Sequence, residues 1–318
     1  MGGTALSENR EVVILCGAES SERDVSIRSG LHAKELLDGK IDVRLVTLDR
    51  NELPDHLNPS RAIIFPLVHG AFGEDGKLQK LLDDEGFVYV GSGADSMEIT
   101  INKARAKDLV AAVAVPTLPH HLFNWTRKNE LPFDELCRCM GCGGKLFLKP
   151  NCGGSSINCA PCCDGAQWSM ALDTKVLCGD WLAEPYCLGC KDITVAILHG
   201  HAIAVMEVSH GCNFFDYDAK YSAGAAKHIC PAQVGEDVIE QLRSYSERAF
   251  SVCKCRDWAR VDFIVGADGV FFLEVNAIPG FTKTSLYPDC AIGAGMSPTQ
   301  CLMKLLEPAL ERHRKRYP

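Results

Sequence analysis

Hydrophobic residues in the first hundred positions fall into short continuous runs, separated by segments with apolar residues at helical spacing. Residues 62–68 form an almost unbroken apolar run, which is typical of a parallel strand buried on both faces. Helices are expected to begin near Val25 and to cover residues 77–85. The expected strands cover residues 11–16, 41–48, 62–68 and 87–90. Strands that alternate with helices predict a doubly wound α/β lobe up to about residue 100.

Polar loops follow two of these expected strands. Ser21 and Glu22 come after the first strand, and the Gly-rich segment 69–76, which begins with His69, comes after the third. Ligands of doubly wound lobes lie beyond the carboxyl ends of the strands. We therefore expect Glu22 and His69 to lie beside a binding site.

The pattern changes after Lys103. A strand over residues 145–149 leads into a loop rich in Gly and Ser, and a hairpin is expected around His199 and Gly200. A loop is expected over residues 213–231, followed by helices over 237–253 and near 299–312. These changes divide the chain into residues 1–102, 103–184 and 185–318, and its length suits two or three lobes.

Residues 259–276 combine two apolar runs with polar residues at alternate positions. The runs 259–265 and 270–275 flank Gly266-Ala267-Asp268-Gly269, whose turn residues predict a hairpin. A three-residue loop centred on Asp268 would place position 262 opposite 274 and position 260 opposite 276. The side-chain period of two then puts one polar group on a single face, namely Arg260, Asp262, Glu274 and Asn276. Such a face suits Mg²⁺ and a phosphate, and the alternative is a solvated face of an antiparallel hairpin.

Composition narrows the class of protein. The chain has 318 residues, of which 47% are hydrophobic and 23% charged, as in ordinary globular proteins of more than one lobe. Its net charge of -8 disfavours nucleic acid as a partner, because nucleic-acid binding rests on neutralising phosphates. No apolar run has the length of a membrane span, and the first residues lack the pattern of a signal peptide. These features predict a cytoplasmic protein.

Seventeen cysteines are many for such a chain. They are odd in number and scattered, so a disulfide framework is not expected. Seven of them cluster at positions 137, 139, 142, 152, 159, 162 and 163. The pairs Cys139/Cys142 and Cys159/Cys162 have the spacing of a zinc ribbon. The alternative is that these thiols act as small hydrophobic groups in a reducing compartment.

Several residues from Lys103 onward suit a nucleotide. Lys103 and Lys149 could meet phosphates as point charges, and the Gly153-Gly154-Ser155-Ser156 loop could wrap a phosphate with backbone N–H groups. Adenine could be bound by the carboxylate of Glu184, the aromatic ring of Tyr186 and the backbone near Cys187. Asp192 could hold the ribose. Each of these residues could instead be an ordinary surface polar group. The loop that carries Lys220 and Tyr221 is expected to act as a lid.

Together these segments resemble the D-alanine–D-alanine ligase family of the ATP-grasp superfamily, from about Val12 to Ser297. The matching segments are Ser21-Glu22-Arg23-Asp24-Val25-Ser26, residues 69–76, Tyr89-Val90-Gly91-Ser92-Gly93, Lys149-Pro150, Gly154-Ser155-Ser156, Tyr217-Asp218-Ala219-Lys220-Tyr221, Ala259-Arg260-Val261-Asp262, Glu274-Val275-Asn276 and Pro279-Gly280-Phe281-Thr282. The resemblance implies an α/β ATP-grasp fold with an N-terminal doubly wound parallel-sheet lobe, and ATP bound between the second and third lobes. The chain departs from the family pattern in the nucleotide loops and near the second substrate, at Gly153, Asn158, Pro185 and Thr284.

The resemblance also implies residue roles. The ATP contacts would be Lys103, Lys149 and Lys220 at the phosphates, Glu184, Tyr186 and Cys187 at adenine, Asp192 at the ribose, and Phe214. The ligands of two Mg²⁺ or Mn²⁺ ions would be Asp262, Glu274 and Asn276. Glu22, Ser155 and Tyr221 would form a linked trio near the amine of the first amino acid, and His69 would also contact the substrate. Arg260 and the Gly280 N–H would stabilise the tetrahedral intermediate. Ser285 and Leu286 would contact the carboxylate of the second amino acid.

The activity implied is the ATP-dependent joining of two D-alanines for peptidoglycan precursor synthesis, by a cytoplasmic homodimer. A related ligase would use D-lactate, D-serine or another amino acid as its second substrate, although Tyr221 favours an amine. A third interpretation is a catalytically inactive nucleotide-binding or zinc-binding module. The intact Arg260, Asp262, Glu274 and Asn276 set argues against it.

Overall fold

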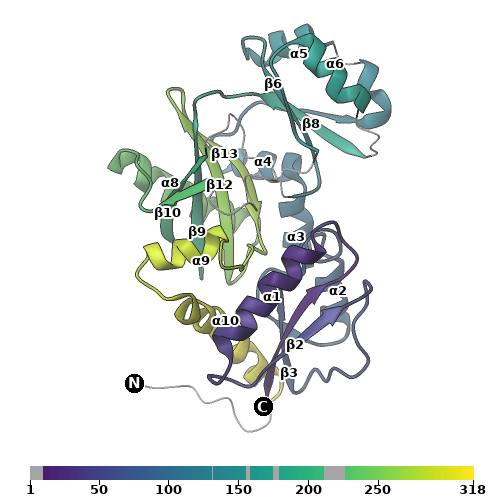
Figure 1. Cartoon of the computed structure of the whole chain (residues 1–318), viewed down its shortest axis with the longest axis vertical. Helices are drawn as coiled ribbons and strands as arrows, with labels where there is room; N and C mark the ends of the chain where they lie inside the picture. The colour runs from purple at the N-terminus through teal and green to yellow at the C-terminus, as the bar shows by residue number, and fades with distance from the viewer. Residues whose placement is uncertain (1–9, 131, 155–157, 175–178, 211–225) are drawn as a thin grey trace.

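Three β-sheets form the framework of the described part of the chain (Figure 1). A computed structural model describes residues 10–130, 132–154, 158–174, 179–210 and 226–318. We call the sheets the parallel sheet, the small sheet and the large sheet. No helix in these ranges combines the length and the hydropathy that crossing a bilayer requires.

The parallel sheet confirms the predicted doubly wound α/β architecture. Its strands, in spatial order, are β2 (Val43–Leu48), β1 (Glu11–Gly17), β3 (Ala62–Pro66) and β4 (Val88–Tyr89). All neighbouring pairs are parallel. The helices of this part are α1 (Arg23–Leu37), α2 (Lys77–Asp84) and α3 (Ala94–Ile101). Every residue of β3 is buried, as its continuous apolar run predicts.

The small sheet holds the strand that was expected over residues 145–149. Its strands, in spatial order, are β5 (His121–Asn124), β8 (Asp180–Pro185), β6 (Leu146–Pro150) and β7 (Ala160–Cys162). A short 3-10 helix, η1 (Trp125–Glu130), and the helices α5 (Phe133–Met140) and α6 (Gly165–Thr174) accompany it (Figure 1). Trp125 and Trp181 lie in its core with ring centroids 4.5 Å apart.

The large sheet is antiparallel and lies between two helical layers. Its strands, in spatial order, are β11 (Ala226–Ile229), β10 (His201–His210), β9 (Lys191–Leu198), β12 (Trp258–Gly266) and β13 (Gly269–Asn276). The helices that pack on it are α4 (Lys103–Ala112), α8 (Glu236–Val252) and α9 (Leu286–Gly293). The predicted helix 237–253 is thus confirmed as α8.

The prediction of a loop over residues 213–231 is wrong for its last part. Ala226–Ile229 form strand β11, which pairs with the edge of β10, with Glu207 opposite Ile229. The sequence Ala-Lys-His-Ile has no strong alternation, so local periodicity did not reveal it. Pairing with an available sheet edge decides its conformation instead. The remainder of the expected loop, up to residue 225, lies outside the described residues.

The β12–β13 hairpin has the predicted pairing but a different loop. Gly266 pairs with Gly269, so the loop is Ala267 and Asp268 and the prediction of a three-residue loop is wrong. Arg260 nevertheless lies opposite Asn276, and Asp262 opposite Glu274.

A β-bulge reconciles the shorter loop with the predicted pairing. The register shifts between Asp262 and Phe263, where Leu273 is the extra residue on β13. A bulge adds one residue to its strand and so restores the phase that a longer loop would have given. Without it, Asp262 would oppose Leu273, and Glu274 would point to the core.

The last helix, α10 (Pro298–Arg316), returns to the parallel sheet and packs with α1, β3 and β4 (Figure 1). Its N-terminus has a capping box formed by Ser297 and Gln300. Arg312 donates to the buried carboxylate of Asp257 at 2.9 and 2.6 Å, and the N–H of Gly91 donates to the same carboxylate at 2.8 Å. These bonds tie the parallel sheet to the start of β12. The three-lobe division at residues 102/103 and 184/185 stays a prediction.

Candidate functional site

One cavity of about 490 Å³ lies where the three sheets meet, a volume typical of small-molecule sites. Every predicted site residue in the described ranges lines it. These residues are Glu22, His69, Lys103, Lys149, Glu184, Tyr186, Cys187, Asp192, Arg260, Asp262, Glu274, Asn276, Gly280, Ser285 and Leu286. The other predicted site residues, Ser155, Phe214, Lys220 and Tyr221, lie outside the described residues.

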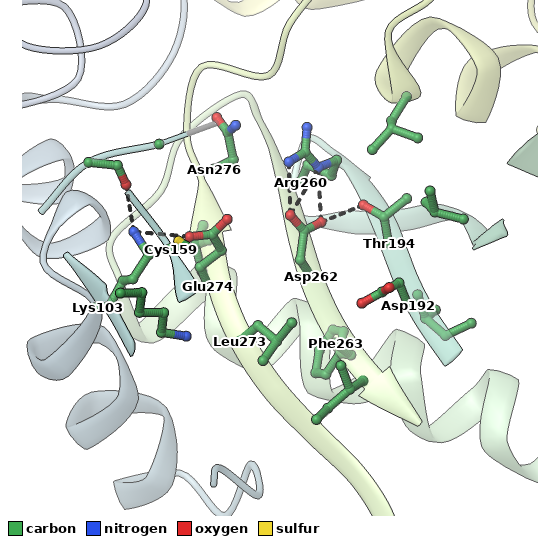
Figure 2. A pocket seen from close by; sticks show the side chains of 18 of the residues that line it. Lys103, Cys159, Asp192, Thr194, Arg260, Asp262, Phe263, Leu273, Glu274 and Asn276 are labelled. Carbon is green, nitrogen blue, oxygen red and sulfur yellow. Dashed lines mark hydrogen bonds and ion pairs between the residues drawn. The ribbon is translucent and has the colours of Figure 1, made fainter. Parts of the chain in front are cut away.

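Strand β12 contributes a charge pair to this cavity. Arg260 donates two parallel hydrogen bonds to Asp262, from Nε to Oδ1 at 2.9 Å and from Nη2 to Oδ2 at 2.8 Å (Figure 2). Thr194 on β9 donates to Oδ1 of Asp262 at 2.6 Å. Burial opposes the charge of Arg260, but Asp262 holds its pKa above the ordinary value. The guanidinium therefore stays charged and oriented inside the cavity.

Strand β13 contributes a second charge pair. Lys103, the first residue of α4, lies 3.2 Å from Oε2 of Glu274 and donates to the carbonyl of Gly153 at 2.5 Å (Figure 2). Burial works against the charge of Lys103, but Glu274 keeps its pKa above the usual value. Lys103 thus connects the large sheet with the Gly-rich loop that follows β6.

The oxygen atoms of this face fit a hard divalent cation. Asp262 and Glu274 are register neighbours, and Asn276 lies two positions further along β13. The amide oxygen of Asn276 accepts the Ile278 N–H at 3.1 Å, which orients the side chain. Two carboxylates and an amide are ligands of the type Mg²⁺ takes. Arg260 and Lys103 already balance the carboxylates, so a cation that arrives with an anionic phosphate suits the site better than a bare ion.

Within the described part of the chain, the cysteines do not come together in the zinc ribbon that their spacing allowed. In the described ranges, no group of three or more His, Cys, Asp or Glu side chains could hold a metal ion. Cys137 and Cys162 are buried in the core of the small sheet, whereas Cys139 and Cys163 are exposed. Spacing along the chain does not bring four thiols together, because helix α5 and strand β7 direct them to different environments.

Two residues that line the cavity, Lys149 and Glu184, form a buried triad of charges with Lys107. Lys149 on β6 donates to Oε1 of Glu184, and Lys107 Nζ lies 3.0 Å from Oε2. Burial by itself would raise the pKa of Glu184, but Lys107 and Lys149 lower it to about 2. For Lys107, which is 0% exposed, burial dominates and lowers the pKa.

Lys107 was not among the predicted site residues. The available signal was its position four residues after Lys103, which puts two lysines on one face of a helix. That spacing could not show that a glutamate of β8 would pair with it.

The parallel sheet brings an acid and an imidazole to the same cavity. Glu22 is 7% exposed and lies against Gly70 and Gly154, where an added methyl group would come within 3.2 and 3.3 Å of its Oε2. His69 contacts the hydroxyl of Ser29 through Nε2 at 3.2 Å and lies 3.5 Å from Glu74. The positions of Glu22 and His69 beyond β1 and β3 confirm the expected edge of the sheet.

The segment after β13 forms the remaining wall. Ser285 directly precedes α9, and its hydroxyl accepts the Thr282 N–H at 2.9 Å. A methyl group on Gly280 would lie 3.0 Å from that hydroxyl, so the close approach favours glycine. Free N–H groups at the start of a helix suit a carboxylate.

Other polar side chains of the wall were not predicted. His228 on β11 lines the cavity and is 2.6 Å from Asp289 of α9 through Nδ1. Glu207 also lines the cavity and is 2.8 Å from Lys191. His228 lay in an expected loop and Asp289 in a helix that was not expected, so no sequence pattern linked them.

Comparison with known proteins gives the same family throughout. Residues 109–307 match the family model described as D-ala D-ala ligase C-terminus. The chain is 34% identical over 304 residues to the D-alanine--D-alanine ligase of Anaeromyxobacter sp. (strain Fw109-5), with 94% of this chain and 97% of that protein covered. It is also 34% identical over 303 residues to the D-alanine--D-alanine ligase of Methylacidiphilum infernorum (isolate V4), with 94% and 95% covered.

Solved structures agree with this result. The D-alanine--D-alanine ligase of Bacillus anthracis, complexed with ATP, superposes with a TM-score of 0.82 at 26% identity, covering 96% of this chain and 99% of that one. The VanG D-Ala:D-Ser ligase of Enterococcus faecalis superposes with a TM-score of 0.81 at 23% identity, covering 95% and 100% respectively, which speaks for the fold alone. The sheets and their shared cavity are therefore those of an ATP-grasp protein, and the chain belongs to the D-alanine–D-alanine ligase family.

Proposed function

We propose that this chain is an ATP-dependent ligase that joins two D-alanines into D-alanyl-D-alanine, with release of ADP and phosphate, for peptidoglycan precursor synthesis. The observation that carries the proposal is the cavity in which Arg260, Asp262 and Glu274 share one hairpin face and Lys103 of α4 pairs with Glu274. A carboxylate does not react with an amine until one of its oxygens becomes a leaving group. Phosphorylation by ATP makes that leaving group as an acyl phosphate.

The cavity has the charges that phosphoryl transfer requires. Lys103 and Lys149 would meet the phosphates of ATP, as would Lys220, and Glu184, Tyr186, Cys187, Asp192 and Phe214 would surround the nucleoside. Asp262, Glu274 and Asn276 would hold two Mg²⁺ or Mn²⁺ ions. Bound there, these ions would neutralise charge on the transferred phosphoryl group. Because Arg260 holds Asp262 bidentately, the carboxylate is oriented in advance.

The amino acids would occupy the part of the cavity between the parallel sheet and α9. Glu22, with Ser155 and Tyr221, would hold the amine of the first D-alanine, and His69 would lie beside it. Ser285 and Leu286 would contact the carboxylate of the second. Arg260 and the Gly280 N–H would stabilise the oxyanion of the tetrahedral intermediate, a contribution of about 10²–10³ in rate for one donor.

A substrate screen tests the reaction. We expect ADP and phosphate to form fastest when ATP is offered with D-alanine alone, and product analysis to show the D-alanine dipeptide. D-Lactate and D-serine, each offered with D-alanine, test the related ligases. Faster formation of a mixed product would assign a different second substrate. No ATP turnover with any pair would support an inactive binding module.

Replacing the proposed metal ligands should change the Mg²⁺ dependence of ligation. In Glu274→Gln and Asp262→Asn, the Mg²⁺ concentration for half-maximal ligation should rise at least about tenfold, since loss of even an outer partner of a metal site typically costs about 10–100-fold. The ligation rate is measured against Mg²⁺ at fixed ATP.

Glu207→Gln is the matched control for these two variants. Glu207 is a carboxylate of the same cavity, but it pairs with Lys191 and is not a proposed ligand. An unchanged Mg²⁺ midpoint in both test variants would remove Asp262 and Glu274 from the metal site.

We extend the proposal to a homodimer that works in the cytoplasm, where ATP is available. Its support is the family to which the chain belongs. Sedimentation of the purified protein at several concentrations tests it. A single species with the mass of one chain at all concentrations would exclude the dimer.

A further inference from the structure

Two cysteines bracket the turn between β8 and β9. Leu188 and Gly189 form the turn, and Cys187 and Cys190 are its first and fourth residues. Gly189 has φ 74°, the backbone that the third residue of a type II turn needs. The end Cα atoms of such a turn lie within about 7 Å of each other. A disulfide needs a Cα separation of about 4.4–6.8 Å, so this turn has suitable dimensions.

The two thiols lie close to one another and beside the ATP cavity. Each thiol shifts the pKa of the other, and both residues line the cavity. Cys187 also contacts the Pro185 carbonyl at 3.9 Å, and Cys190 packs against Gly266, the last residue of β12. Both thiols are half-buried, and Leu188 beside them is 43% exposed. A small molecule can therefore reach the pair from solvent.

The location connects this pair to nucleotide binding. Residues 186–190 are the whole connection between β8 of the small sheet and β9 of the large sheet. Glu184, which belongs to the buried triad, comes three residues before Cys187. A covalent link across this turn would fix a segment that joins two walls of the cavity.

We propose that Cys187 and Cys190 form a reversible disulfide by exchange with a low-molecular-weight disulfide, and that the linked form binds ATP more weakly. The second half of this statement rests on the proposed function. Closing the bond would draw Cys190 away from Gly266 and Cys187 away from the Pro185 carbonyl. It would also displace the backbone that faces the nucleotide. A typical coupling between two sites predicts a loss of ATP affinity of about tenfold.

The exchange is balanced in atoms and electrons. One thiolate attacks a sulfur of the small disulfide and releases a thiol, and the second cysteine then attacks the mixed disulfide and releases the other thiol. Two electrons and two protons pass from the protein to the small disulfide. Burial, with help from Cys190 and Glu184, raises the pKa of Cys187 to about 11. The reaction should therefore be slow near neutral pH and accelerate as pH rises.

The first measurement is covalent and does not depend on activity. The reduced full-length protein is equilibrated with mixtures of oxidised and reduced glutathione, with and without ATP, and free thiols are then alkylated. The tryptic peptide over residues 176–191 should lose two hydrogens and resist alkylation at positions 187 and 190, with the label on Cys178 alone. Because coupling is reciprocal, ATP should protect the dithiol by the same factor by which the disulfide weakens ATP binding.

The second measurement is the dissociation constant of ATP before and after oxidation. Wild type should lose about tenfold in affinity and recover it with a reducing agent. Cys190→Ser, compared with its own reduced form, should lose nothing. Cys142→Ser is the matched control, because Cys142 contacts Cys137 outside the cavity, and this variant should respond like wild type.

Three outcomes would overturn the proposal. One is the absence of a 187–190 link in the mapped peptide. Another is a linked protein that binds ATP as tightly as the reduced one. The third is a Cys190→Ser variant that is as sensitive to oxidation as wild type, which would point to another thiol such as Cys159. If the reduced wild type does not bind ATP at all, the proposed function fails, and the peptide map still decides whether the disulfide forms.

Discussion

Replacing Arg260 by alanine is expected to lower the ligation rate about 10²–10³-fold while ATP still binds. The proposed oxyanion faces the guanidinium of Arg260, which is held in place by the two hydrogen bonds that it donates to Asp262. Since this donor is oriented before the reaction, its loss acts on the transition state more than on the bound substrates. The measurements are kcat for dipeptide formation and the dissociation constant of ATP.

A second role of Arg260 has to be separated from the first, because the same guanidinium also orients the proposed metal ligand Asp262. If orientation were its whole contribution, added Mg²⁺ would restore the alanine variant. We expect kcat to stay low at saturating Mg²⁺. Arg260→Lys keeps the charge but loses the planar fork, and an intermediate rate is expected.

Arg243→Ala is the matched control for this experiment. Arg243 lies on α8, outside the residues that line the cavity, and donates to the Ala202 carbonyl at 2.9 Å. Its replacement should leave kcat near wild type. Turnover of Arg260→Ala within a few-fold of that control would refute the oxyanion role.

Replacing Glu184 by alanine should destabilise the fold by about 3–5 kcal/mol. The change leaves the buried ammonium groups of Lys107 and Lys149 without their shared carboxylate. Buried charges without a partner are far more costly than exposed ones. Urea unfolding followed by circular dichroism measures the loss.

Two further variants make this prediction sharper. Glu207→Ala removes a carboxylate whose partners are Lys191, which is 39% exposed, and the Gln233 N–H at 3.2 Å, so its loss should cost only about 1–2 kcal/mol. Combining Glu184→Ala with Lys107→Met removes one of the unpaired cations and should recover part of the stability. Additive losses in the double variant would show that Lys107 and Glu184 do not interact.

The same triad predicts a pH dependence. The pKa of Glu184 falls from its ordinary value of 4.5 to about 2 in the folded protein. The contribution of ionised Glu184 to the stability of the fold is therefore complete above pH 4.5 and is lost as pH falls through about 2. The stability gap between wild type and Glu184→Gln should narrow over this window. A gap that stays constant from pH 5 to pH 2 would contradict the lowered pKa.

Much of the fold and of the candidate site could be predicted from the sequence. Period-two alternation placed Arg260, Asp262, Glu274 and Asn276 on one hairpin face, and the structure confirms those pairings. The strands β1 and β3 followed from continuous apolar runs, and the glycine-rich loops at their ends pointed to Glu22 and His69. These features are local, since alternation and continuous burial leave a pattern within a few residues.

The tertiary structure alone decided how distant segments meet. The bulge at Leu273 corrected a loop that is one residue shorter than predicted, and the edge of β10 recruited β11. The pairing of Lys107 with Glu184 joins residues 77 positions apart and depends on how α4, which packs on the large sheet, meets β8 of the small sheet. The separation of Cys137, which is buried, from Cys163, which is exposed, likewise depends on packing. Local periodicity records which face of an element is buried, but the choice of the partner that covers it is made by long-range packing and charge pairing, which leave no local pattern.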